Sequence, residues 1–136
     1  MNSESLGYEV ELAASFDEAI ELVTQALAAE GFGIISRVDI DKAFKEKLGK
    51  SFRPYTILGA CNPALAHTAL TTNPEVGLFL PCNVTVEETG IEQSLVRVIN
   101  AEAMMSAGGL DKDIEIKNVG MDASERLKRV VAELNK

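Results

Sequence analysis

The chain opens with a pattern that predicts a strand, a helix and a second strand. Residues 6–12 alternate apolar and acidic side chains, which is the period of a half-buried strand. Ser15 and Glu18 have the spacing of a helix capping box, and Gly31 is typical of the position just after a helix. Residues 32–38 are β-branched and apolar, as in a strand. The intervening helix is expected to bury the side chains that recur at helical spacing: Phe16, Ala19, Ile20, Val23, Ala26 and Leu27.

A short helix is predicted next, beginning at Asp39 or Asp41 and ending at Gly49. Residues 41–53 form a basic island, with five Lys and Arg against two Asp and Glu. Such lysines usually form the solvated face of a helix. The alternative is an anion site, especially if Arg53 approaches the amides of a helix N-terminus. The helix is expected to bury its apolar side chains: Ile40, Phe44 and Leu48.

Residues 53–61 are predicted to form a third strand, with Pro54 tolerated only at its start. Asn62 and Pro63 then provide a cap followed by proline at the first helical position, which is the preferred way to open a helix. This helix is expected to end before Pro74. Its inward-facing residues are expected to be Leu65, Ala66, Ala69 and Leu70.

A β-hairpin is predicted in the second half of the chain. Residues 78–88 are expected to form a long strand with apolar side chains at the even positions from 78 to 86, residues 89–90 signal a turn, and residues 94–100 return as the partner strand. The acidic residues around this turn are interpreted as solubilising charges: Glu87, Glu88 and Glu92.

Residues 101–120 give a weaker signal, interpreted as a loop or a single helical turn with a short strand near Ile114 and Ile116. A last helix is expected to begin at a capping box formed by Asp122 and Glu125. Its apolar face comprises Leu127, Val130, Val131 and Leu134.

The pattern as a whole predicts an α/β (α+β) fold, since each helix has one apolar stripe that needs a sheet face to cover. We expect a mixed, largely antiparallel sheet of about five strands with helices packed on it, in the order βαβαβαββα. A chain of 136 residues is long enough for one such core and too short for two, so residues 1–136 are expected to form a single domain.

The net charge of −8, from 21 acidic and 13 basic residues, limits the classes of partner that the protein is expected to bind. It repels phosphate backbones and anionic membranes, so neither a nucleic acid nor a membrane is an expected partner. The first residues contain no basic and apolar export signal, and two cysteines make no disulfide framework. We therefore expect a cytoplasmic protein with reduced thiols.

Cys61 and Cys82 are the first candidates for chemistry. If the third and fourth strands are neighbours, both thiols lie near one end of the sheet. Cys61 directly precedes a helix N-terminus, whose free amides stabilise a thiolate. Cys82 has the apolar parity of its strand, which is typical of a small buried side chain. Neither belongs to a Cys-x-x-Cys pair, which excludes a thioredoxin-like motif.

His67 is the single histidine and lies away from the centre of the apolar stripe of its helix, so it is expected at the edge or exposed. Cys61, His67 and Cys82 are a soft set of metal ligands, but a structural zinc site needs a fourth. A nucleophilic pair of Cys61 and His67 is another alternative. No phosphate loop, nucleophile elbow or zinc-protease motif is present, so catalytic residues and a cofactor are left unassigned.

Four segments carry a resemblance to a known family: KEKLG (45–49), FRP (52–54), GACNPALAHTAL (59–70) and GLFLPCNV (77–84). Over roughly residues 8–100, the chain resembles the small prokaryotic domains of domain of unknown function family 302. The resemblance implies a compact α/β domain, commonly an assembly of two copies, with no established activity. The signature positions it implies are Lys47, Gly49, Cys61, Asn62, Pro63, His67, Pro81, Cys82 and Asn83.

Three functions remain open from the sequence. The first is a homodimeric module that binds a small molecule or anion, because breaks at Pro54, Pro63 and Pro81 are expected to converge at sheet ends, where α/β folds keep their sites. The second is a thiol-redox or metal-binding protein that uses the two cysteines and the histidine. The third is an assembly domain without a small-molecule site. The candidate ligand-binding residues are Lys47, Arg53, Cys61, Asn62, His67, Cys82 and Asn83.

Overall fold

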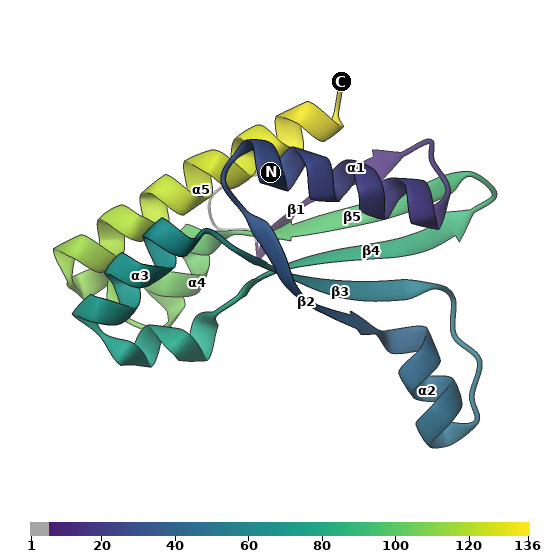
Figure 1. Ribbon diagram of the computed structural model, residues 1–136, viewed down its shortest axis with the longest axis horizontal. Helices are drawn as coiled ribbons and strands as arrows, with labels where there is room; N and C mark the ends of the chain where they lie inside the picture. The colour runs from purple at the N-terminus through teal and green to yellow at the C-terminus, as the bar shows by residue number, and fades with distance from the viewer. Residues whose placement is uncertain (1–5) are drawn as a thin grey trace.

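All four neighbouring strand pairs of the sheet are antiparallel, in the order β1-β5-β4-β3-β2 (Figure 1). The computed structural model describes residues 6–136 and confirms the predicted α/β class. The chain start, on which the expectation of no export signal rests, lies outside the described residues. The strands are β1 (Gly7–Leu12), β2 (Gly33–Asp39), β3 (Tyr55–Cys61), β4 (Cys82–Gly90) and β5 (Gln93–Ile99).

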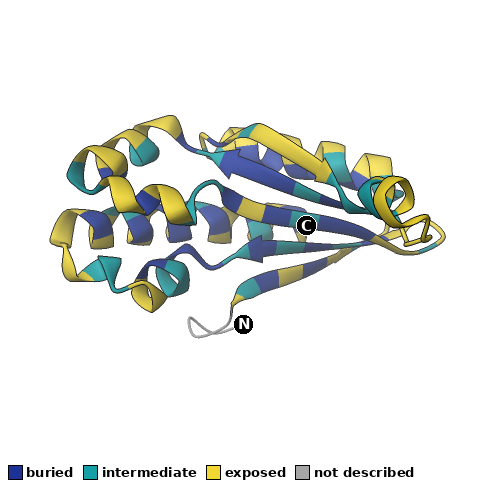
Figure 2. Cartoon of the chain, turned by 90° about the horizontal axis from the view of Figure 1, so that it is seen from below, coloured by how far each residue is buried: buried dark blue, intermediate teal, exposed yellow. Residues whose placement is uncertain are grey.

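Helices cover one face of this sheet and leave the other open. α1 and α5 pack over the sheet, and α3 and α4 extend the helical layer beyond its end (Figure 1), while the opposite face is seen directly in Figure 2. None of the described helices is long and apolar enough to cross a membrane. The helices are α1 (Phe16–Ala29), α2 (Ile40–Leu48), α3 (Pro63–Thr72), α4 (Ala101–Ala107) and α5 (Ile114–Leu134), with 3₁₀ turns η1 (Pro74–Phe79) and η2 (Leu110–Lys112).

The period-two alternation of the strands places the core between the sheet and the helices. Val10, Val96 and Val86 stand side by side across β1, β5 and β4 and are buried. The capping box of α1 is confirmed, because the Ser15 hydroxyl accepts from the Glu18 amide at 3.2 Å and donates to its carboxylate at 2.9 Å. The residues that complete this core from α1 and α5 include Ala19, Val23, Leu27, Leu127 and Val130.

The prediction of a strand over residues 78–80 is wrong. Asn73 accepts from the Glu75 amide at 3.0 Å and starts η1, so the alternating apolar residues sit in a 3₁₀ turn and Leu78 is exposed. The strand begins only at Cys82, after the cis Leu80–Pro81 peptide.

Residues 101–120 form α4, η2 and the first turns of α5, where the sequence predicts a loop or a single helical turn and a short strand near Ile114 and Ile116. Asn100 caps α4 by accepting from the Ala103 amide at 3.1 Å. Asp113 caps α5 by accepting from the Glu115 amide at 2.9 Å, so the last helix starts well before Asp122. Asp122 instead lies inside α5 and pairs with Arg126 at 2.8 Å.

The short helix has its predicted bounds but buries none of its residues. Ile40 and Phe44 are half-buried and Leu48 is exposed, because α2 packs mainly against β2 and β3. On α3, Ala69 is buried as expected, but Leu70 is exposed. The apolar spacing therefore located these helices correctly, but fewer of their apolar side chains are buried than it predicts.

Candidate binding site on the open sheet face

A groove of about 440 Å³ crosses the open face over β1, β5 and β4. Strand register explains its walls, because Glu9, Arg97 and Thr85 stand side by side at positions that point away from the helices. Asn83 lies two residues along β4 from Thr85, and Tyr55 contributes from β3. The complete lining is Leu6, Gly7, Glu9, Tyr55, Asn83, Thr85, Arg97, Val98 and Ile99.

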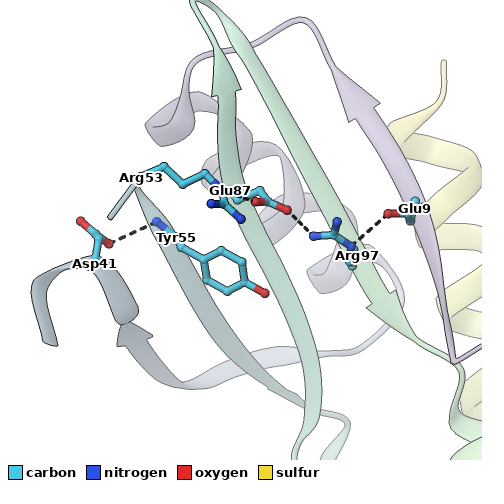
Figure 3. Close-up of polar contacts among 6 residues, drawn as sticks. All are labelled: Glu9, Asp41, Arg53, Tyr55, Glu87 and Arg97. Atoms are coloured by element: carbon cyan, nitrogen blue, oxygen red, sulfur yellow. Dashed lines mark hydrogen bonds and ion pairs between the residues drawn. The ribbon is translucent and has the colours of Figure 1, made fainter. Parts of the chain in front are cut away.

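A chain of ion pairs runs beside the groove (Figure 3). The Glu87 carboxylate accepts from Arg53 Nε at 2.6 Å and from Arg97 Nη1. Arg97 Nε also donates to the Glu9 carboxylate at 3.0 Å. The side chain of Glu87 is 5% exposed although no helix covers this face, because the two arginine side chains lie against it. The interpretation of Glu87 as a solubilising charge is therefore wrong.

The positive and negative charges within this row of ion pairs balance one another. Burial by itself would raise the pKa of Glu87, but the hydrogen bonds and charges of Arg53 and Arg97 outweigh it and hold the pKa below its ordinary value of 4.5. The hydrogen bond to Glu87 in turn raises the pKa of Arg97. The two arginines therefore face the two carboxylates of Glu9 and Glu87.

Thr85 is the one side chain of the groove whose polar atom is buried without a partner. Its hydroxyl oxygen makes no hydrogen bond to any group in residues 6–136. Arg97 stands directly opposite Thr85 on β5, and Ile57 stands opposite it on β3. A buried hydroxyl without a partner costs about 1–3 kcal/mol, so this position calls for a physical explanation.

The two cysteines lie at one end of the sheet, as predicted. Ala60 pairs with Cys82 across β3 and β4, so Cys61 is displaced from Cys82 by a single residue. Both line a cavity of about 30 Å³, together with Asn62 and apolar side chains of the helices. Burial raises the pKa of Cys82 to about 11, with a smaller contribution from Cys61. Cys82 is therefore a protonated thiol at neutral pH.

The other candidates are not brought to this cavity. His67 is exposed on α3, as expected, and Lys47 is exposed on α2. Arg53 pairs with Glu87 at the opposite end of β3, so it does not approach the α3 N-terminus. In the part of the chain that the structure describes, no three His, Cys, Asp or Glu side chains are grouped to hold a metal ion. Cys61, His67 and Cys82 accordingly form no ligand set.

The asparagines and prolines divide between two places. Asn62 caps α3 by accepting from the Leu65 amide at 3.2 Å, as predicted, whereas Asn83 lies in the groove wall. Pro63 and Pro81 adjoin the cysteine end of the sheet. Pro54 precedes β3 at the opposite end, so the expected convergence of three proline breaks is wrong.

Apart from Asn83, the residues that line the groove are not among the candidates predicted from the sequence, although a signal for them exists. Thr85 and Glu87 alternate with buried valines along β4, and Arg97 sits between Val96 and Val98 on β5. Polar side chains at these odd positions are typical of an uncovered sheet face. The two patterns become one site only when β4 and β5 are known to pair.

A larger hollow of about 690 Å³ lies between α1 and the end of α5. Its charged residues are paired, with Arg129 Nε donating to the Glu30 carboxylate at 2.9 Å. Within residues 6–136 no buried side-chain oxygen or nitrogen in its lining lacks a partner. The open-face groove is therefore the stronger candidate.

Comparison with known proteins points to one family. The chain matches the family model described as domain of unknown function DUF302 over residues 8–134. It is similar to the crystal structure of an uncharacterized conserved protein DUF302 from Bacillus stearothermophilus, with 28% sequence identity and a TM-score of 0.81. That similarity covers 94% of this chain and 97% of the other. No curated protein matches the chain. The resemblance inferred from residues 45–84 is thereby confirmed.

Proposed function

Because the chain belongs to the family described as domain of unknown function DUF302, which names no activity, we propose a function from the groove itself. The protein is a binding module that holds a small, uncharged, largely apolar molecule on the open sheet face. The observation that carries this proposal is the Thr85 hydroxyl, which is buried in the groove wall without a partner. A ligand with one hydrogen-bonding end would supply that partner.

The charges around the groove support an uncharged ligand over an anion. Arg97 already serves Glu9 and Glu87, so an anion would compete with two carboxylates for one guanidinium group. The remaining walls offer the ring of Tyr55, the Val98 and Ile99 positions and the Asn83 amide. An aromatic ring with an amide or carbonyl group combines the apolar area and the single polar end that these walls favour.

The test compares two ligands of the same shape and different charge. Benzamide and benzoate are titrated into ¹⁵N-labelled protein to about 10 mM, which detects millimolar affinity. Benzamide is expected to shift the amide signals of Asn83, Thr85 and Arg97, with benzoate at least threefold weaker. Equal binding of both compounds, or shifts confined to other surfaces, would contradict the proposal.

The matched variants use the buried hydroxyls without partners. Thr85→Val keeps the shape of the side chain and removes the hydroxyl, so benzamide binding is expected to weaken by about tenfold, which corresponds to one hydrogen bond. Ser124→Ala removes a second such hydroxyl, which lies on α5 outside the groove. It is expected to leave benzamide binding unchanged.

As part of the same proposal we place the protein in the cytoplasm. Both cysteines are free, and a reducing compartment keeps them so. Cell fractionation with a tagged chain tests this location, and recovery in an exported fraction would overturn it.

A further inference from the structure

Helix α2 and the segment that returns from it to β3, residues 40–53, form an arm that leaves apolar side chains uncovered. Figure 1 shows α2 standing away from the sheet end, and none of its residues is buried. Phe44 and Phe52 pack edge to face with ring centroids 5.3 Å apart, yet Phe52 stays 39% exposed and Leu48 63% exposed. Apolar side chains gathered on one projecting element and rimmed by polar residues are typical of an interaction surface.

The arm is also basic in an otherwise acidic protein. Residues 41–53 carry a net charge of +3, whereas the chain as a whole carries −8. Among the ion pairs in the described part of the chain, none involves Lys45, Lys47 or Lys50. The dipole of α2 accounts for lysines in its last turn, Lys45 and Lys47, but not for Lys50 beyond the Gly49 cap. The arm therefore has positive charge left for a partner.

The positive charge and the apolar surface adjoin one another on the arm. Leu48 follows Lys45 by three residues in α2, and side chains at this spacing are neighbours on a helix surface. Gly49 then ends the helix with a left-handed backbone, and Lys50 follows directly. A partner that fits this surface needs carboxylates for the lysines and an apolar side chain for Leu48.

A flat anionic membrane fits the arm less well than a narrow chain does. The Glu88 amide donates to the Pro54 carbonyl at 3.0 Å, which brings the exposed Glu88 beside the base of the arm. Glu92 is exposed on the hairpin turn at the same end of the sheet. A wide negative surface would meet these carboxylates together with the lysines, whereas a single polypeptide segment can contact the arm alone.

A single-stranded nucleic acid is also narrow, but its bases bind by stacking on open aromatic rings. The guanidinium group of Arg53 lies over the Phe52 ring, 4.4 Å from its centroid. Phe44 and Tyr55 pack against the same ring. The Phe52 ring is therefore held among side chains of its own chain, which favours a polypeptide over a nucleic acid.

We propose that the α2 arm docks an acidic segment of another protein, whose carboxylates pair with the lysines of the arm and whose apolar side chain packs on Leu48 and Phe52. The groove stays free in this arrangement, because the lining of the groove contains no residue from 40–53. The inference goes beyond the proposed function, because docking on the arm needs no ligand in the groove.

The experiment measures the binding of two fluorescently labelled polymers to the full chain by anisotropy. Poly-glutamate supplies carboxylates alone, and a random copolymer of glutamate and tyrosine of the same length supplies carboxylates together with apolar rings. At about 50 mM salt, where exposed charges are weakly screened, the dissociation constant of the copolymer is expected to be about tenfold lower than that of poly-glutamate. The reason is that only the copolymer covers the apolar side chains of the arm.

A first pair of variants tests the charge of the arm. Lys45→Gln with Lys50→Gln removes two of its positive charges and is expected to weaken the binding of both polymers by about fivefold, as the loss of two exposed charge pairs does. The matched control is Lys112→Gln with Lys117→Gln, which makes the same change on exposed lysines outside the arm. It is expected to leave both dissociation constants unchanged.

A second pair of variants tests the apolar surface. Leu48→Gln is expected to remove the preference for the copolymer and to leave the binding of poly-glutamate unchanged. Its control is Leu78→Gln, which alters an exposed leucine on η1, outside the arm. This control is expected to keep the preference for the copolymer.

The proposal is overturned if the wild-type chain binds neither polymer, if it binds both equally, or if the control variants weaken binding as much as the arm variants do. Tighter binding to phosphatidylglycerol vesicles or to poly-uridylate than to the copolymer also overturns it, and would assign the arm to a membrane or to RNA. Circular dichroism confirms that each variant is folded. Benzamide titration of the Lys45→Gln, Lys50→Gln variant should match that of the wild type, which keeps failure of the arm distinct from failure of the groove.

Discussion

Gly59 of β3 lies directly against the ring of Pro81. A Cβ placed on Gly59 would stand 2.6 Å from Pro81 Cγ and would also overlap the Ser36 hydroxyl. The Ser36 side chain can rotate away, but the proline ring cannot. We therefore expect Gly59→Ala to lower the free energy of unfolding by about 1–3 kcal/mol, as overpacking does in a well-packed site. Urea denaturation measures this loss.

Gly33 provides the control for this prediction, because it is also a strand glycine and a Cβ there meets nothing within 4 Å. Gly33→Ala is expected to change the free energy of unfolding by less than about 0.5 kcal/mol. Equal effects of the two substitutions would contradict the conclusion that the Pro81 contact is what makes alanine unfavourable at position 59.

The buried carboxylate of Glu87 makes stability depend on pH. Its pKa is held below the ordinary value of 4.5, so its contribution is complete above about pH 4.5 and is lost as pH falls through the folded-state value. Glu87→Gln is expected to cost about 1–2 kcal/mol at pH 7, because both arginine partners are half exposed and screened by water. Urea unfolding at pH 7 and pH 3.5 checks this cost.

The gap between wild type and Glu87→Gln should shrink at the lower pH, because pH 3.5 lies below the ordinary pKa of 4.5 and the unfolded chain then carries this carboxyl mostly protonated. Glu88→Gln on the same strand is the control, since Glu88 is exposed and its removal should matter little at either pH. A gap that stays constant with pH would mean that the charge of Glu87 is not what stabilises the fold.

Asn62 joins two helices with one side chain. Its Oδ1 accepts from the Leu65 amide at 3.2 Å, and its Nδ2 donates to the Glu30 carbonyl at 3.4 Å. Asn62→Ala removes both contacts and is expected to cost about 1–2 kcal/mol. Asn62→Asp keeps the cap acceptor and loses the donor, so thermal unfolding should place its stability between wild type and Asn62→Ala. A loss as large as that of alanine would assign the whole effect to the Glu30 contact.

The two thiols should differ in reactivity while the protein is folded. A pKa of about 11 leaves about one Cys82 thiol in 1,000 ionised at pH 8, and the side chain is buried, whereas Cys61 is partly exposed. Iodoacetamide is therefore expected to label Cys61 at least tenfold faster than Cys82, as followed by peptide mass spectrometry. Labelling in guanidinium chloride should remove the difference. Faster labelling of Cys82 in the folded protein would contradict its burial.

Local patterns predicted the elements whose caps and periodicity agree with the fold. The Ser15 cap and the Asn62–Pro63 helix start are confirmed, and the predicted hairpin is present, but its turn lies at residues 91–92 and not at residues 89–90, which end β4. The predicted start of α5 is wrong because Asp122 and Glu125 have the spacing of a capping box although they lie inside the helix. The N-cap is Asp113. A capping pattern indicates a start only where the preceding turn is not already helical.

The candidate site was harder to predict because its residues are neighbours only across strands. The cysteine end of the sheet followed from sequence, since Cys61 and Cys82 have similar local surroundings and their strands pair. Thr85 and Arg97 lie twelve residues apart, and their proximity depends on the register of the hairpin. The open face that exposes them depends on which side α1 and α5 cover, which no local pattern specifies.

The pairing of β1 with β5 has a consequence for synthesis of the chain on the ribosome. β1 comprises Gly7–Leu12 and has β5, Gln93–Ile99, as its strand neighbour. The first strand to be made must therefore wait, with its backbone unpaired, until about two-thirds of the chain has been translated. Non-local pairing of this kind closes slowly and exposes an edge that other chains can join. Glu9 and Glu11 give that edge negative charge, which disfavours its pairing with the same edge of another copy.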